Sequence, residues 1–433
     1  MATLTKPVSL SIRSYQVGFG DCFLLTFHYG NKATDPKRHL LIDFGTTGTP
    51  KKLGSPSKLQ EKIAEDIKTT CNDTLHGIVV THRHKDHLSG FDGKSGKIIA
   101  NLNPKVVIQP WTEHPDADPK ASSPPSPTKG FVAALENMHG FSANALRELS
   151  SLKVSQTVRK QLSFLGEDNL KNLGAVQTLM GMKAKHFYVN AGQVLPLGKT
   201  FPGVTFHVLG PPTLKQTNTI KKQRSSDKDE FWMLNNFWGL QANSVKKGVG
   251  SRSVFGKAFL SQNSTPPFSV RWFFPRLENL RGEQILELVR ILDKAMNNTS
   301  VILLMEVGKK VLLFPGDAQI ENWEYALKVA PERKQWRQLL KKVDVYKVGH
   351  HGSRNATPKT LWETFTRKAE SDKPSRLKTF LSTMNGKHGS ESRGTEVPRR
   401  TLEKALATSS ILYDTRAIKG ATKYWLDEAI PLH

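Results

Sequence analysis

The sequence predicts a mixed α/β protein of the α+β kind, in which two stacked mixed sheets lie between outer helices as a four-layer αββα sandwich. Three observations predict this fold. Strand-like apolar runs occur in two separate blocks, segments with helical spacing accompany both blocks, and polar residues that suit a metal site lie at the ends of runs in both. Because these polar residues are scattered along nearly the whole chain, we expect a single domain over 1–433.

The first block contains five expected strands and one helix. The strands are expected at 8–14, 22–27, 39–43, 77–80 and 106–108. Ser55-Pro56-Ser57 is typical of a helix start, because proline is tolerated in the first turn of a helix. Leu59, Ile63 and Ile67 then follow at steps of four, which is helical periodicity.

The second block contains further strands and a helix, and two other segments are interpreted as insertions. The strands are expected at 204–209, 300–305, 311–314 and 343–348, and the helix at 283–296. The insertions cover about 116–180 and 213–280. The first joins a Pro-, Ser- and Asp-rich loop to a helical pattern, and the second mixes basic with aromatic residues. No internal repeat is visible.

The charge of the chain is strongly positive. Its 433 residues include 63 Lys and Arg against 38 Asp and Glu, a formal charge of +25, with a pI near 9.9. A surface of this kind attracts polyanions, and the sequence favours nucleic acid or another phosphate-rich partner. The alternative is that the basic residues only keep the protein in solution.

Cysteine content and hydropathy indicate where the chain is expected to work. The two cysteines, Cys22 and Cys71, do not make a disulfide framework, and reduced thiols suit the cytoplasm. The first seven residues lack the apolar run of a signal peptide. The most apolar segment, 301–314, is interrupted by a glutamate and two lysines, so no membrane partner is expected.

One short segment concentrates groups that bind metals. Thr81-His82-Arg83-His84-Lys85-Asp86-His87 follows a buried strand and has the pattern H-x-H-x-D-H. Side chains alternate along an extended segment, so His82 and His84 should point the same way. Imidazole and carboxylate groups at this density suit zinc, and also manganese or iron. The alternative is a solvated basic loop that is rich in histidine.

With its later motifs the chain resembles the metallo-β-lactamase superfamily. Members of that family have an early Asp at a strand end, then H-x-H-x-D-H, a bridging Asp after a later strand, and a final His. The corresponding residues here are Asp43, the segment 82–87, Asp317, and His350 or His351. Their order along the chain is the family's order. The resemblance implies the αββα sandwich and two divalent metal ions, expected to be Zn, with Mn as an alternative and a single ion as another.

Within this family, the chain is most similar to the soluble β-lactamase-like domain of ComEC-type DNA-uptake proteins. Three motifs carry the similarity: Val17-Gly18-Phe19-Gly20-Asp21, Gly316-Asp317, and Lys347-Val348-Gly349-His350-His351-Gly352-Ser353. They extend from residue 17 to residue 353. The membrane-spanning part of those proteins has no counterpart in this sequence.

The resemblance implies a role for each matching residue. His82 and His84 would bind the first metal, Asp86 and His87 the second, and Asp317 would bridge the two ions. His351 is preferred over His350 as the last ligand because it immediately precedes a glycine, which leaves His350 in the second shell or facing substrate. Asp43, and with it Asp21, would anchor the ligand loop by hydrogen bonds.

The sequence departs from the family pattern at the third ligand of the first metal. Most members supply it from a Gly-His-Thr-type turn, and this chain has none. The candidates in that interval are Glu113, His114, His186 and His207. A later polar segment, Leu381 to Ser390, also follows an apolar stretch, and its His388 is a candidate general acid or oxyanion donor. A plain glycine-rich turn is the alternative for that segment.

These residues predict a metal-dependent hydrolase. The metals would lower the pKa of a bound water from about 15.7 to roughly 7. Asp317 would hold the metal pair, and Asp86 could also steer the resulting hydroxide. The charge and the ComEC-like motifs favour a nuclease or phosphodiesterase. Two alternatives stay open: a small-molecule hydrolase acting on a lactone, β-lactam or thioester, and a non-catalytic sensor of nucleic acid.

Overall fold

The computed structural model describes residues 6–30, 35–114, 172–217, 296–353, 355–371, 373, 375–388, 396–420 and 422–432. All of these residues belong to one compact unit. Most of the two expected insertions, about 116–180 and 213–280, lies outside the described residues, as does the predicted helix 283–296 apart from its last residue. A single domain over the whole chain therefore stays a prediction.

The first sheet has seven strands. Asp43 lies at the end of one of its central strands, and the segment 82–87 follows the neighbouring strand. The order of the strands is β14 (Trp425–Pro431), β1 (Pro7–Tyr15), β2 (Cys22–Tyr29), β3 (Lys37–Phe44), β4 (Gly77–Val79), β5 (Val106–Pro110) and β6 (Lys185–Val189). The pairs from β14 to β3 are antiparallel, and the pairs from β3 to β6 are parallel.

The second sheet repeats this plan. Its order is β7 (Val194–Leu195), β8 (Val204–Gly210), β9 (Ile302–Val307), β10 (Lys310–Phe314), β11 (Val345–Lys347), β12 (Lys378–Leu381) and β13 (Ile411–Asp414). Three antiparallel pairs are again followed by three parallel pairs. The two sheets thus share a topology although no internal repeat is visible in the sequence.

The two sheets pack face to face through an apolar core. Alternate side chains of β1, β2 and β3 meet those of β8, β9 and β10 in one buried cluster. At its centre the ring of Phe23 lies 5.7 Å from that of Phe314 and 6.3 Å from that of Phe380, both edge-on. Burial of each such ring contributes about 1.5–3 kcal/mol, so this core holds the sheets together.

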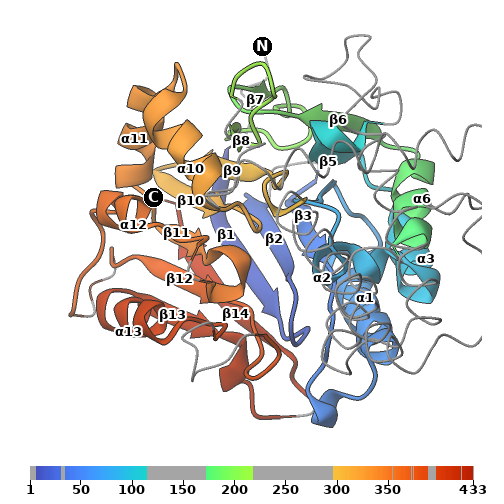
Figure 1. The fold of residues 1–433 in the computed structure, drawn as a ribbon. Helices are drawn as coiled ribbons and strands as arrows, with labels where there is room; N and C mark the ends of the chain where they lie inside the picture. Colours follow the sequence, from blue (N-terminus) through green and yellow to red (C-terminus); the bar gives the residue numbers. More distant parts are fainter. Residues whose placement is uncertain are drawn as a thin grey trace, which may run out of the picture. The chain divides into compact units, whose positions relative to one another are not determined.

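Helices cover the outer face of each sheet (Figure 1). On the first sheet lie α1 (Pro56–Thr70), α3 (Gly93–Asn101) and α6 (Leu173–Gly181). On the second lie α10 (Ile320–Glu324), α11 (Arg333–Lys341), α12 (Lys359–Thr364) and α13 (Arg400–Ser409), with a π turn at Tyr325–Val329. The apolar residues of α1 that recur at steps of four are buried, as their spacing predicts. The four-layer αββα sandwich is therefore confirmed.

The remaining short elements lie in loops. They are α2 (Lys85–Leu88) and the 3₁₀ turns Lys51–Leu53, Ser89–Phe91, Trp111–Glu113, Gly349–Gly352 and Thr415–Ala417. Among the described residues, no helix is both long enough and apolar enough to cross a bilayer. The loops that follow β3, β4, β10, β11 and β12 carry the polar motifs, since the carboxyl ends of parallel strands lie at one edge of a sheet.

Candidate metal centre

The H-x-H-x-D-H segment leaves the end of β4 as extended chain and turns into a short helix. His84 still has an extended backbone and precedes α2, which begins at Lys85. The amide of His87 then donates to the His84 carbonyl at 3.0 Å. This change from strand to helix places Asp86 and His87 beside His82, whose ring centroid lies 4.1 Å from that of His87.

Asp43, at the end of β3, holds this segment by three hydrogen bonds. Its carboxylate accepts from the backbone N–H of Thr81 at 2.7 Å, from the Thr81 hydroxyl at 2.8 Å, and from Nδ1 of His87 at 2.8 Å. Because the carboxylate fixes the proton on Nδ1, the Nε2 atom of His87 is left to face the other side. Asp43 has φ +54°, an uncommon conformation for a residue other than glycine.

Asp317 comes from the loop after β10 in the second sheet. It follows Gly316, whose φ is +55° and where a Cβ atom would lie 2.7 Å from the side chain of Thr81. Glycine at this position therefore lets the two sheets approach closely. Oδ1 of Asp317 lies 3.2 Å from Nε2 of His87, and Oδ2 of Asp317 lies 4.0 Å from Nε2 of His82.

The paired histidines after β11 both have positive φ, +45° for His350 and +51° for His351. The two side chains differ in burial. His351 is fully buried, donates from Nδ1 to the carbonyl of Ser382 at 3.0 Å, and places Nε2 3.1 Å from Asp86 and 3.6 Å from Asp317. His350 is 26% exposed, and its Nε2 lies 3.7 Å from Asp317.

These side chains make two overlapping groups of metal donors, in each of which the donor atoms lie within 4.8 Å of one another. One group is Asp21, His87, Asp317 and His351, and the other is His82, Asp86 and His87. His84 adjoins them, since its Nδ1 lies 3.0 Å from Nε2 of His82. The structure thus brings together all six residues that the sequence analysis proposed as ligands.

The electrostatics of this cluster suit a bound cation. Burial alone would lower the pKa of His87, but Asp317, Asp43 and Asp86 raise it above its ordinary value. Burial would raise the pKa of Asp317, but His87, His350 and His351 hold it well below its ordinary value. Burial and the neighbouring histidines lower the pKa of His82, which favours the neutral imidazole that metals require.

Two buried polar atoms of the cluster indicate whether its residues fit a metal ion. Nε2 of His87 and Oδ1 of Asp317 are buried and neither makes a hydrogen bond of good geometry, although they face each other. Buried polar atoms without partners are costly, and a divalent cation would supply the missing interaction. The donors are imidazole nitrogens and carboxylate oxygens, which suit zinc or manganese. The residues therefore fit a metal.

The four candidates for a third ligand of the first metal have other partners. Glu113 pairs with Arg83 at 2.8 Å, and His207 pairs with Glu306 at 2.7 Å. His114 and His186 both lie against the ring of Tyr188. Among the described residues, none of the four belongs to a donor group.

His388 is separated from His351 of the cluster by the ring of Phe19. The ring centroid of Phe19 lies 4.4 Å from that of His351 and 4.2 Å from that of His388. Burial lowers the pKa of His388 to about 4, against the opposing effect of Asp86. The imidazole is therefore neutral near pH 7, and in this form its N–H group can donate a hydrogen bond.

A buried lysine is the functional candidate that the sequence analysis did not single out. Lys347 ends β11, is 2% exposed, and forms an ion pair with Asp21. The signal was present, because this lysine follows Val345 and Tyr346 within the strand-like run at 343–348. A charge placed inside such a run is rarely buried without a partner.

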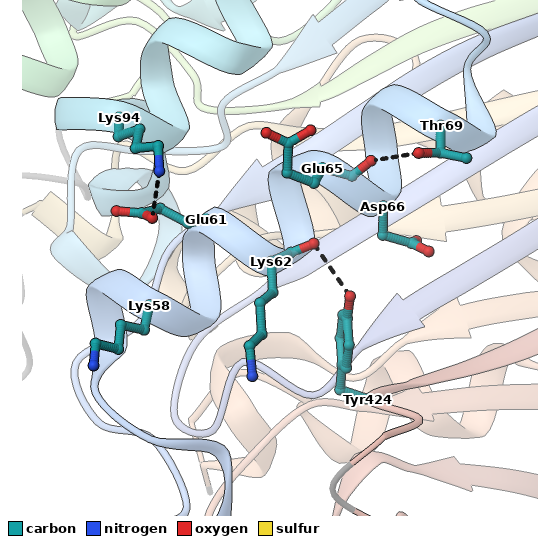
Figure 2. A pocket seen from close by; sticks show the side chains of 8 residues that line it. All are labelled: Lys58, Glu61, Lys62, Glu65, Asp66, Thr69, Lys94 and Tyr424. Atoms are coloured by element: carbon teal, nitrogen blue, oxygen red, sulfur yellow. Dashed lines mark hydrogen bonds and ion pairs between the residues drawn. The ribbon is translucent and has the colours of Figure 1, made fainter.

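A surface hollow of about 620 Å³ beside α1 is a different feature (Figure 2). Charged side chains line it, and they interact with neighbouring groups: Lys94 pairs with Glu61 at 3.1 Å, and the Tyr424 hydroxyl donates to the Lys62 carbonyl at 3.1 Å. None of the residues that line it belongs to the donor groups. We therefore place the candidate site at the histidine and aspartate cluster.

Comparisons with known proteins give limited matches. No protein-family model matches the chain. Over 78 residues, or 18% of this chain, the sequence is 33% identical to recombination protein 2 of Haemophilus influenzae, and that stretch is 9% of the relative's length. A mutant of CmlA beta-hydroxylase aligns with a TM-score of 0.34 and 10% identity, over 96% of this chain and 53% of that one.

Proposed function

We propose that this protein is a metal-dependent hydrolase that cleaves phosphodiester bonds, as a nuclease or phosphodiesterase. One observation carries the proposal: Nε2 of His87 and Oδ1 of Asp317 are buried, face each other at 3.2 Å, and lie among further imidazoles and carboxylates. Buried carboxylates that lie this close to one another favour a bound cation among them.

The proposed ligands divide between two ions, as the family resemblance implies. His82 and His84 would hold one ion, and Asp86, His87 and His351 the other, with Asp317 between them. Two observations support ion binding at the Nε2 atoms of His87 and His351. Nδ1 of His87 is engaged by Asp43 and Nδ1 of His351 by the Ser382 carbonyl, so both imidazoles present Nε2 to the carboxylates of the centre. His350 is partly exposed beside Asp317 and would face substrate.

Bound divalent ions would activate water for attack and polarise the phosphoryl oxygen. The chain's own residues have separate tasks. Asp86 and Asp317 keep their carboxylates ionised, since nearby histidines, His87 foremost, lower the pKa of each despite burial, and ionised oxygens can orient the attacking water. His388, neutral near pH 7, would donate a hydrogen bond to the negative charge that develops on the substrate.

Charge and relatives favour a phosphodiester over other substrates. A formal charge of +25 attracts polyanions and speeds their encounter with the protein. The name of the partial relative, recombination protein 2, points to nucleic acid in the same way. The motifs shared with ComEC-type proteins support the same substrate class. The aromatic and basic segment 221–252, which lies outside the described residues, remains a proposed contact to nucleic acid.

The proposal is tested with full-length protein by combining elemental analysis with a cleavage panel. We expect bound zinc or manganese, and metal-dependent cleavage of DNA, RNA or a cyclic nucleotide that weakens as salt rises. Asp317→Ala should lose both metal and activity, whereas His207→Ala should keep both, because His207 lies outside the donor groups. Intact substrates throughout the panel would refute phosphodiester hydrolysis. Turnover of a lactone or thioester would instead support a small-molecule hydrolase.

A further inference from the structure

Lys347 places a permanent positive charge next to the candidate metal centre. Its ammonium group pairs with Asp21, lies 3.8 Å from Oδ1 of Asp317, and donates to the Gly316 carbonyl at 3.4 Å. Lys347 and Asp21 are both almost completely buried. The pair also joins the two sheets, because Asp21 precedes β2 and Lys347 ends β11.

Asp21 lies behind the proposed ligands rather than in front of them. Its carboxylate oxygens are 3.6 Å from Nδ1 of His87 and 3.7 Å from Nδ1 of His351. The Nε2 atoms of the same two rings face Asp317 and Asp86. The centre therefore has an Nδ1 side, which holds Asp21 and Lys347, and an Nε2 side, which holds the proposed ions.

The Nδ1 side could itself attract a cation. The carboxylate of Asp21 belongs to one of the donor groups, with His87, Asp317 and His351, and a buried carboxylate without a partner draws in a positive charge. Lys347 already provides that charge. An ion bound to Asp21 would have to displace the ammonium group, and repulsion from it opposes a divalent ion at that position.

We propose that Lys347 is a positioning residue that neutralises Asp21 and confines divalent ions to the Nε2 side of the centre. This inference rests on the proposed function only in requiring that the centre binds metal. It assigns Asp21 to the set of residues that support the ligands, because the lysine occupies its carboxylate. It also explains why a charged pair, rather than an apolar one, fills this buried position.

The test compares the number of Mn²⁺ ions bound by the full chain with the number bound by Lys347→Met, measured by equilibrium dialysis and elemental analysis. Methionine has a similar length and no charge. We expect Lys347→Met to bind one more Mn²⁺ per chain than the wild type, and Asp21→Asn/Lys347→Met to return to the wild-type number. Lys310→Met is the matched control, because Lys310 pairs with Asp344 at 3.2 Å away from the centre, and it should not change the number.

A second variant keeps the test decisive if Lys347→Met does not fold. Asp21→Asn leaves the ammonium beside Asp317 without its partner, so Mn²⁺ affinity should fall by at least about tenfold. Wild-type affinity in this variant, or an unchanged ion number in folded Lys347→Met, would overturn the role of Lys347. Wild-type protein that binds no Mn²⁺ or Zn²⁺ would instead contradict the proposed function at its first step.

Discussion

Two groups of buried histidines in this protein differ in the carboxylates around them. At the candidate metal centre, His87 and His351 lie among several buried aspartates. Elsewhere, His39 of β3 and His76, which precedes β4, are also buried, with ring centroids 6.0 Å apart. Among the described residues, the carboxylate that pairs with this group is Asp35, which is partly exposed and lies 2.5 Å from Nε2 of His76.

The protonation of the two groups shows what this difference does. Carboxylates raise the pKa of His87 and His351 despite burial. Burial and neighbouring positive charges lower the pKa of His39 to about 4, and burial lowers that of His76. Burial of imidazole alone therefore gives a neutral core histidine, whereas burial together with several carboxylates gives a place that attracts cations.

The largest effect is expected from a substitution at Asp317. Asp317→Asn removes the carboxylate that faces His82, His87, His350 and His351. We expect metal content to fall below one ion per chain and kcat/KM to fall by about a thousandfold or more, because the charge that holds the cations is lost. Elemental analysis and a phosphodiester assay measure the two effects. A variant with normal metal content and activity would remove Asp317 from the centre.

His388 sharpens the comparison, because its pKa is lowered like that of His39 although it lies near the centre. His388→Ala should lower kcat by about a hundredfold while metal content stays at the wild-type value, since a neutral imidazole contributes a hydrogen bond rather than a ligand. Kinetics and elemental analysis on one sample separate these outcomes. Lost metal in this variant would make His388 part of the ligand set.

Asp43 tests how far the carboxylates act through the histidines. Asp43→Asn keeps the size of the side chain but weakens its bonds to Thr81 and His87. Metal affinity should fall by about 10–100-fold, a smaller effect than the loss of Asp317, because Asp43 orients a ligand without being one. Titration calorimetry with Mn²⁺ measures the change. Unaltered affinity would show that His87 is oriented by other contacts.

His39 should affect stability but not metal binding, and it therefore provides the control for metal. Its folded pKa of about 4 is lower than the ordinary 6.5, so the unfolded chain binds its proton first as pH falls. Stability is thus fully present above pH 6.5 and is lost between pH 6.5 and 4, by about 3 kcal/mol for this group. Urea unfolding at pH 7 and pH 4 should show this loss in the wild type and much less in His39→Gln. Metal content should be identical in both, and a difference would contradict the separation of the two groups.

Local sequence was sufficient for much of the fold and for the first half of the site. Periodicity predicts α1 and most strands, and the H-x-H-x-D-H spacing brings four candidate ligands within six residues. Asp317 and His351 are predicted as ligands only from the order of the motifs along the chain and from the family resemblance. Their distance from the segment 82–87 depends on how the second sheet packs on the first. Contacts such as Asp21 with Lys347 depend on the same packing, so spacing along the chain does not reveal them.

The left-handed backbone at Asp43, His350 and His351 has a consequence for attempts to improve the protein. Such conformations cost about 1–3 kcal/mol each in residues other than glycine. Selection of heat-resistant variants should therefore enrich glycine at these three positions. The stabilised variants would lack the two imidazoles and the carboxylate at these positions. Selection for thermal stability alone would therefore remove groups of the candidate site.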